Sequence, residues 1–253
     1  MDPFSSIPRP EMPSPPLAEL PPHGSSPLSP PWTLYTVAVS LTSGYILIPL
    51  LASQCLLLIN PFLDGTAQLF CQQSLTLLAW LSIFVFLRFR YGAFRPYIGL
   101  NLTRPKAYYA WETVRLTLIT ASLLVGLNLL WTVLGKQTAV KLPYAGASHA
   151  ELLVLSLFAV FMAPVLEEVI FRGLVQSTFH KLYSPLMSVF MTSLVFLVLH
   201  GNYFQDFQAL SQVMILGFCF GLWRERTQSI LPGIMAHLFN NALASIVLLW
   251  HAS

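Results

Sequence analysis

The stretch Ala163-Pro164-Val165-Leu166-Glu167-Glu168-Val169-Ile170-Phe171-Arg172-Gly173 decides how this chain folds. It places two adjacent carboxylates and one guanidinium inside an apolar run that extends from Leu152 to about Phe179. A run of that length predicts a membrane-spanning helix. Each charge at such depth costs about 3 kcal/mol even on lenient insertion scales, so we expect all three charges to be paired or functional.

The spacing within this stretch predicts different roles for its two glutamates. On an α-helix each residue turns by about 100°, so Glu168 and Arg172 lie on one face and can form an ion pair. Glu167 points roughly 140° away from Arg172 and is free to serve another partner. Pro164 frees the carbonyl four residues earlier and favours a kink. The alternative is that all three charges form one structural network between helices.

Composition predicts an all-α, polytopic membrane helix bundle of seven or eight spans with an intramembrane polar cavity. The chain has 253 residues, 55% hydrophobic and 9% charged, with a mean hydropathy of +0.67; soluble domains are about 25% charged. The net charge of +3 is small, so we expect no nucleic-acid partner. The three cysteines are scattered without CxxC spacing, which indicates neither a disulfide framework nor a soft-metal site.

We expect three regions along the chain. Residues 1–31 are rich in proline and predict a disordered cytoplasmic tail. Residues 32–112 hold two spans and a loop with five basic residues, which the positive-inside rule places in the cytoplasm. Residues 113–253 hold the remaining spans, and we expect them to form the functional core. The seven expected spans cover residues 32–59, 69–87, 114–134, 152–179, 185–200, 210–223 and 230–250.

Polar residues on three of these spans can meet inside the membrane. At 1.5 Å per residue, Glu167 and His200 lie about 21 and 22 Å from the cytoplasmic ends of their helices, so they can be level. His237 and Asn241 lie about 10 and 16 Å deep and reach the same zone if their helix is tilted or starts earlier. They share one helix face, as Phe196 and His200 do on theirs.

This set of side chains suits the hydrolysis of a peptide bond. Glu167 and His200 can hold a water between them, with the carboxylate as general base. His237 and Asn241 can donate hydrogen bonds to the oxyanion that forms. Asn241 can instead bind helices together through its amide. A zinc ion on Glu167, His200 and His237 is a further possibility, but no HExxH motif is present and the water mechanism requires no cofactor.

The motifs resemble those of the CPBP (Abi) family, the type II CAAX-processing endopeptidases and their prokaryotic relatives. The family pattern EExxxR, FxxxH and HxxxN stands here as Glu167-Glu168 with Arg172, Phe196 with His200, and His237 with Asn241. The resemblance covers residues 110 to 250. It implies that Glu167 and His200 activate water, that His237 and Asn241 form the oxyanion site, that Glu168 and Arg172 give structural support, and that Phe196 lines the site.

The resemblance implies an intramembrane endopeptidase that acts on a membrane-tethered protein or peptide, of the prenylated CAAX type in eukaryotic members. We expect an integral multi-pass protein in the plasma membrane of a prokaryote, with the lipid bilayer as its surroundings. Two other classes stay open: a non-catalytic scaffold or bacteriocin-immunity factor, and an ion or proton transporter. No internal repeat favours the transporter.

Overall fold

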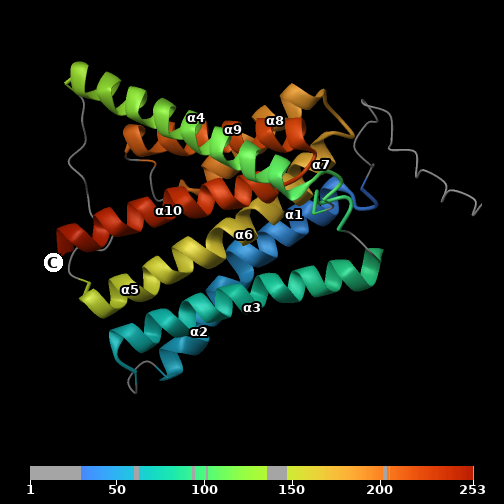
Figure 1. Ribbon diagram of the computed structural model, residues 1–253. Helices are drawn as coiled ribbons and strands as arrows, with labels where there is room; N and C mark the ends of the chain where they lie inside the picture. The colour runs from blue at the N-terminus through green and yellow to red at the C-terminus, as the bar shows by residue number, and fades with distance from the viewer. Residues whose placement is uncertain are drawn as a thin grey trace, which may run out of the picture.

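The computed structural model describes residues 30–59, 63–92, 95–100, 102–135, 147–201, 204 and 206–252, and the predicted tail up to residue 29 lies outside them. Seven helical rods run antiparallel within these residues (Figure 1). The rods are α1–η1–α2 (Leu34–Thr42, Ser43–Leu47, Ile48–Ile59), α3 (Gly65–Tyr91), α4 (Lys106–Val133), α5–η3–α6–η4–α7 (His149–Leu157, Phe158–Met162, Ala163–Glu167, Glu168–Val175, Gln176–Phe179), α8 (Pro185–Leu199), α9 (Phe207–Thr227) and α10 (Leu231–Ala252).

The seven rods confirm the expected all-α membrane bundle. Five helices of the described chain are long and apolar enough to cross a membrane, and Pro185–Leu199 is a shorter apolar helix. Most rods extend past the apolar runs that predicted them, since a helix satisfies its own backbone hydrogen bonds whatever its side chains. The largest extension is in α4, which begins at Lys106 where the apolar run begins at residue 114.

Two π-helical segments each stand just before a proline. η1 ends at Leu47, one residue short of Ile48-Pro49, and η3 ends at Met162, one residue short of Ala163-Pro164. In both, the residue before proline donates its N–H to the carbonyl five residues earlier, Ile48 to Ser43 and Ala163 to Phe158. Proline has no N–H with which to continue that ladder. The helix therefore accommodates each intramembrane proline by adopting a wider, π-helical turn just before it.

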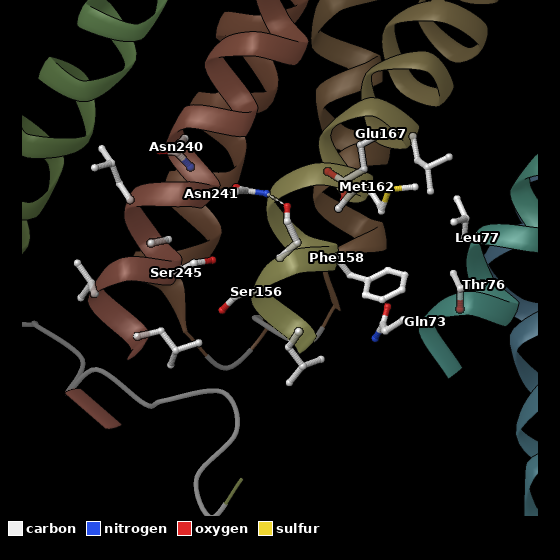
Figure 2. A pocket seen from close by; sticks show the side chains of 18 of the residues that line it. Gln73, Thr76, Leu77, Ser156, Phe158, Met162, Glu167, Asn240, Asn241 and Ser245 are labelled. Atoms are coloured by element: carbon white, nitrogen blue, oxygen red, sulfur yellow. Dashed lines mark hydrogen bonds between the residues drawn. The ribbon is translucent and has the colours of Figure 1, made fainter. Parts of the chain in front are cut away.

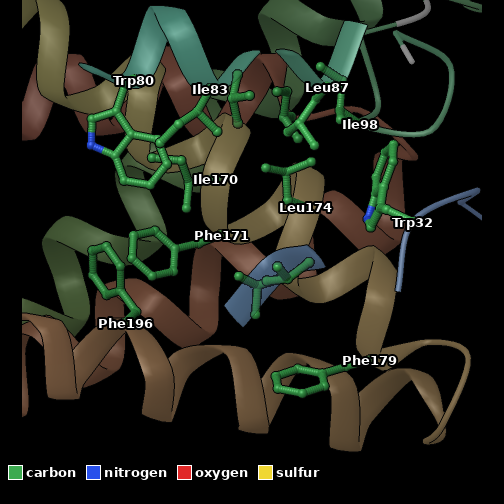
Figure 3. Close-up of a cluster of buried hydrophobic side chains, with 14 of the residues drawn as sticks. Trp32, Trp80, Ile83, Leu87, Ile98, Ile170, Phe171, Leu174, Phe179 and Phe196 are labelled. Atoms are coloured by element: carbon green, nitrogen blue, oxygen red, sulfur yellow. The ribbon is translucent and has the colours of Figure 1, made fainter. Parts of the chain in front are cut away.

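The hydrophobic core lies around η4, whose eight residues are all buried. Figure 3 shows Ile170, Phe171 and Leu174 of this segment among side chains from several other elements. Trp32, just before α1, is fully buried and donates its indole N–H to the Thr178 hydroxyl at 2.9 Å. The fourth rod is therefore the central element of the fold.

A tight contact closes the core at the end of the bundle where α3 stops and α4 starts. Ile98, in the connection between them, is 1% exposed. It packs on Gly173 so closely that a Cβ on this glycine would lie 2.9 Å from the Ile98 Cβ. The Trp32 ring lies against Tyr97 in the same connection. These contacts fill the space between η4 and that end of the bundle.

A polar network ties α7 to α9 at the same end, beyond the predicted sixth span (210–223). Glu225 Oε1 lies 2.7 Å from His180 Nε2 and 3.2 Å from Arg224 Nη1, and it accepts a hydrogen bond from Gln176. Burial by itself raises the pKa of Glu225, but the hydrogen bond from His180, the Arg224 charge and Gln176 outweigh burial and hold the pKa below its ordinary value. The ionised carboxylate therefore stabilises the fold.

This network predicts an acid-sensitive contribution to stability. Because the folded pKa of Glu225 is depressed, the contribution is complete above the ordinary value of 4.5 and is lost as the pH falls through the folded value. Glu225→Gln should lower the melting temperature of detergent-solubilised protein at pH 7, and this difference from the wild type should shrink between about pH 5 and pH 3. The matched control is Gln228→Glu at an exposed position. A difference that does not change with pH would contradict the assignment.

Candidate active site

The Glu168–Arg172 ion pair that the sequence predicted is present. Arg172 Nη1 lies 3.0 Å from Glu168 Oε1, and both side chains are 0% exposed. The pair forms although this part of the helix is π-helical. The two charges neutralise each other at membrane depth, as the cost of a lone charge in that environment requires.

Arg172 is fixed by three further contacts. Its Nη2 donates to the Gly217 carbonyl of α9 at 2.9 Å. Its guanidinium carbon lies 4.8 Å from the Phe196 ring centre and 5.5 Å from that of Phe220. A desolvated cation between aromatic faces gains about 2 kcal/mol. Arg172 thereby ties the fourth rod to α8 and α9.

His237 stands between the two glutamates. Its Nδ1 lies 3.4 Å from Glu168 Oε1, and its Nε2 lies 3.7 Å from Glu167 Oε2. The sequence placed His237 shallower than Glu167 unless α10 is tilted, and the structure brings them level because α10 packs along η3 and α6. Arg172, Glu168, His237 and Glu167 thus form one chain of alternating basic and acidic groups.

His200 lies at the end of α8, where it caps the helix. Its Nδ1 is 2.7 Å from the Phe196 carbonyl oxygen, and the two rings are 4.3 Å apart. The Phe196 ring also lies 6.5 Å from the ring of His237. The imidazole within ion-pair distance of Glu167 is that of His237. The water shared by Glu167 and His200 stays a prediction.

Asn241 bridges two helices through a carbonyl that Pro164 leaves without a donor. Its Nδ2 donates to the Ala159 carbonyl at 2.8 Å. The sequence analysis expected Pro164 to free the carbonyl four residues earlier, that of Val160. In the widened π turn the carbonyl that lacks its donor is five residues earlier, that of Ala159. One amide hydrogen of Asn241 therefore serves the helix-binding role, and the oxyanion role expected from the sequence stays a prediction.

Glu167 reaches a cavity of about 820 Å³. Its side chain is 20% exposed, whereas that of Glu168 is 0% exposed. Figure 2 shows Glu167 on one wall, with Asn240 and Asn241 of α10 nearby. The structure thus separates the glutamates as their spacing predicted, with Glu168 paired inside the protein and Glu167 facing open space.

The comparison with protein families identifies this part of the chain. Residues 149–243 match the model described as type II CAAX prenyl endopeptidase Rce1-like. This segment of the chain is therefore similar to an Rce1-like domain. The matched segment contains all seven predicted site residues and is shorter than the range, 110 to 250, over which the motifs suggested a resemblance. Comparison with curated proteins found no match, and comparison with solved structures also found none.

The Rce1-like domain does not gather a metal-ligand set in the described chain. Among those residues, no three His, Cys, Asp or Glu side chains stand in an arrangement that could hold a metal ion. Glu167 and His237 are neighbours, but together with His200 they do not form such an arrangement. The zinc set considered from the sequence therefore does not fit this geometry, and no step below depends on a metal.

Two residues of the Rce1-like site were missed by sequence reasoning. Phe220 packs on Arg172 and lies 5.1 Å from the His237 ring, but a phenylalanine within an apolar helix carries no signal. Gly233 lets α10 approach Glu168, since a Cβ there would lie 2.8 Å from Glu168 Oε2. A signal did exist for Gly233, because it stands four residues before His237 on the same helix face.

The buried ion pair predicts a large loss of stability when one partner is removed. Glu168→Gln leaves the Arg172 charge without its counter-charge in a fully buried position, and breaking such a pair costs about 3–5 kcal/mol. We expect a lower folded yield by size-exclusion chromatography and a lower melting temperature. The double variant Glu168→Gln with Arg172→Met should recover part of the yield. An unchanged yield for the single variant would contradict this role.

Proposed function

We propose that this protein is an intramembrane endopeptidase that hydrolyses a peptide bond of a membrane-associated protein or peptide. The similarity of residues 149–243 to a protease family supports a hydrolase at the coarse level. The observation that carries the proposal is the difference between the glutamates. Glu168 forms an ion pair with Arg172. Glu167 faces a cavity large enough for a peptide and lies beside the imidazole of His237.

In this mechanism Glu167 acts as the general base. It removes a proton from a water molecule while the water oxygen bonds to the carbonyl carbon of the substrate, and the carbonyl electron pair moves to the oxygen. The proton then passes to the leaving nitrogen as the carbon–nitrogen bond breaks. The products are a carboxylic acid and an amine, so the water molecule supplies every atom that is added.

We assign His237 the role of a proton relay, in place of the oxyanion donor expected from the sequence, because both of its ring nitrogens face glutamates. In this proposal Glu168 accepts a hydrogen bond from the Nδ1–H of His237. The other ring nitrogen of His237, Nε2, then carries no proton and faces Glu167, 3.7 Å away. A proton taken up by Glu167 then has an acceptor on the path to the leaving nitrogen. Glu168 acts as a positioning residue, because it orients the ring without touching the substrate.

His200 and Asn241 complete the proposed site. His200 holds the attacking water from the side opposite Glu167, as the motifs imply. Asn241 donates its second amide hydrogen to the oxyanion, its first being used on Ala159. Each such donor contributes about 3 kcal/mol in a water-poor site. A prenylated CAAX-type protein is the substrate that the family name suggests.

The general-base role makes Glu167→Gln the decisive variant. The substitution is nearly isosteric and removes the base, so cleavage of a membrane-tethered reporter peptide should fall by at least about 100-fold. The variant should accumulate to the same level and melt at the same temperature as the wild type, because the ion pair between Arg172 and Glu168 is unchanged. The matched control is Glu151→Gln, which changes a carboxylate at the start of the same rod, far from the site.

Retained cleavage by Glu167→Gln would contradict hydrolysis at this site. A cellular activity that survives Glu167→Gln but is lost when residues 1–31 are removed would favour the scaffold or immunity role. Proton flux by purified protein in sealed vesicles would favour a transporter. Each result points to one class, because only the protease requires the Glu167 carboxylate as a base.

A further inference from the structure

The two ends of the bundle differ in charge. Nine of the 13 lysines and arginines stand at the end where α3, α7 and α9 stop: Arg88, Arg90, Arg95, Arg104, Lys106, Arg115, Lys181, Arg224 and Arg226. Among the described residues, the opposite end carries Asp64, Glu151 and Asp206. By the positive-inside rule, the basic end faces the cytoplasm.

The cavity that holds Glu167 extends away from the basic end. On the fourth rod its lining runs from Glu167 back to Leu155, close to the start of α5. On α10 it runs from Asn240 to Leu248, close to the C-terminal end of that helix. Figure 2 shows this lining continuing below Glu167 past Ser156 and Ser245. None of the lining residues comes from η4 or from the connection before α4.

The path from Glu167 to the basic end is filled. Every residue of η4 is buried, and Ile98 packs tightly on Gly173. Trp32 is 0% exposed beside them, and Lys181 Nζ donates to its carbonyl at 2.6 Å. A peptide could reach Glu167 from that side only by displacing this core.

The cavity wall presents carboxamides that lack protein partners. In the described part of the chain, neither Gln73 of α3 nor Asn240 of α10 makes a hydrogen bond to the protein. Asn128 of α4 accepts from Gln208 and Gln212 through its oxygen, and its amide nitrogen has no acceptor there. Polar groups left unsatisfied at membrane depth are costly, so these groups require water or a polar ligand.

The chemistry of the lining indicates what that ligand is. A carboxamide both donates and accepts, which matches a peptide backbone. Glu167 is the one carboxylate of the lining, and none of its residues is a lysine or arginine, so nothing there would bind a phosphate head group. The distance from Leu155 to Glu167 is about 18 Å along the axis, which an extended chain covers with about five residues.

We propose that the substrate reaches Glu167 from the end opposite the basic clusters, as an extended, uncharged peptide segment whose backbone is hydrogen-bonded by Gln73, Asn128 and Asn240. This inference rests on the proposed hydrolytic function. It assigns the scissile bond to a segment presented from the extracytoplasmic side of the membrane, and this sets the substrate apart from a prenylated CAAX-type protein, whose lipid anchors it at the cytoplasmic face. A helical substrate must unwind over about five residues to enter.

Thiol labelling tests the direction of access without any need for catalysis. Single cysteines replace Ser245 in the cavity, Ala150 at the acidic end and Leu182 at the basic end, in a chain whose Cys55, Cys71 and Cys219 are changed to serine. A membrane-impermeant thiol reagent is applied to sealed vesicles of each orientation. Ser245→Cys should react from the side that labels Ala150→Cys. Labelling from the side that labels Leu182→Cys, or from neither side, would overturn the inference.

Kinetics test the carboxamide wall. Gln73→Leu and Asn240→Leu should each raise KM by about threefold to tenfold with little change in kcat, because each removes a hydrogen bond to the bound peptide. The matched control is Gln72→Leu, which changes an exposed neighbour outside the lining and should leave KM unchanged. Unchanged KM in both cavity variants would refute the peptide-binding role. Glu167→Gln could abolish cleavage while Ser245→Cys is labelled only from the side that labels Leu182→Cys. That result would support the hydrolytic function and reject the proposed direction of access.

Discussion

The buried ion pair between Glu168 and Arg172 is the interaction on which the rest of this structure depends. Neither charge is exposed, and each would be prohibitive alone in a bilayer. Together they form a fixed centre to which Phe196, Gly217, Phe220 and His237 all attach. Because Arg172 is paired with Glu168, the carboxylate of the neighbouring Glu167 can face the cavity. The pair therefore supports the fold and leaves Glu167 as the carboxylate that faces the cavity.

Proline and π-helical geometry determine how this centre is presented. The widened turn of η3 leaves the Ala159 carbonyl without a backbone donor, and Asn241 supplies one from α10. That hydrogen bond helps to hold α10 against the fourth rod, where His237 can reach both glutamates. An irregular backbone is tolerated in a membrane where a neighbouring helix satisfies the freed group, and here the same contact assembles the site.

The bundle is closed at one end and hollow at the other. Trp32, Ile98 and the residues of η4 form a packed core beneath the basic clusters. On the other side of Glu167 the helices leave a cavity whose walls include Gln73 and Asn240, two carboxamides that make no hydrogen bond to the described part of the protein. Such an arrangement gives Glu167 access to a polar cavity while the Glu168–Arg172 pair stays buried. It also gives the cavity one direction along the bundle, which the motifs alone do not specify.

The sequence by itself determined the class of fold, the Glu168–Arg172 pair and the division between the two glutamates, and it limited the bundle to seven or eight spans, because helical periodicity and the cost of charge in a bilayer are local properties. It also carried the three motifs by which the family was anticipated. Only the tertiary structure decided that His237 is the imidazole beside Glu167, that Asn241 binds Ala159, that Phe220 and Gly233 belong to the site, and that the cavity extends away from the basic end. Those facts depend on how separate helices tilt and pack against each other, and spacing along a single helix does not specify that packing.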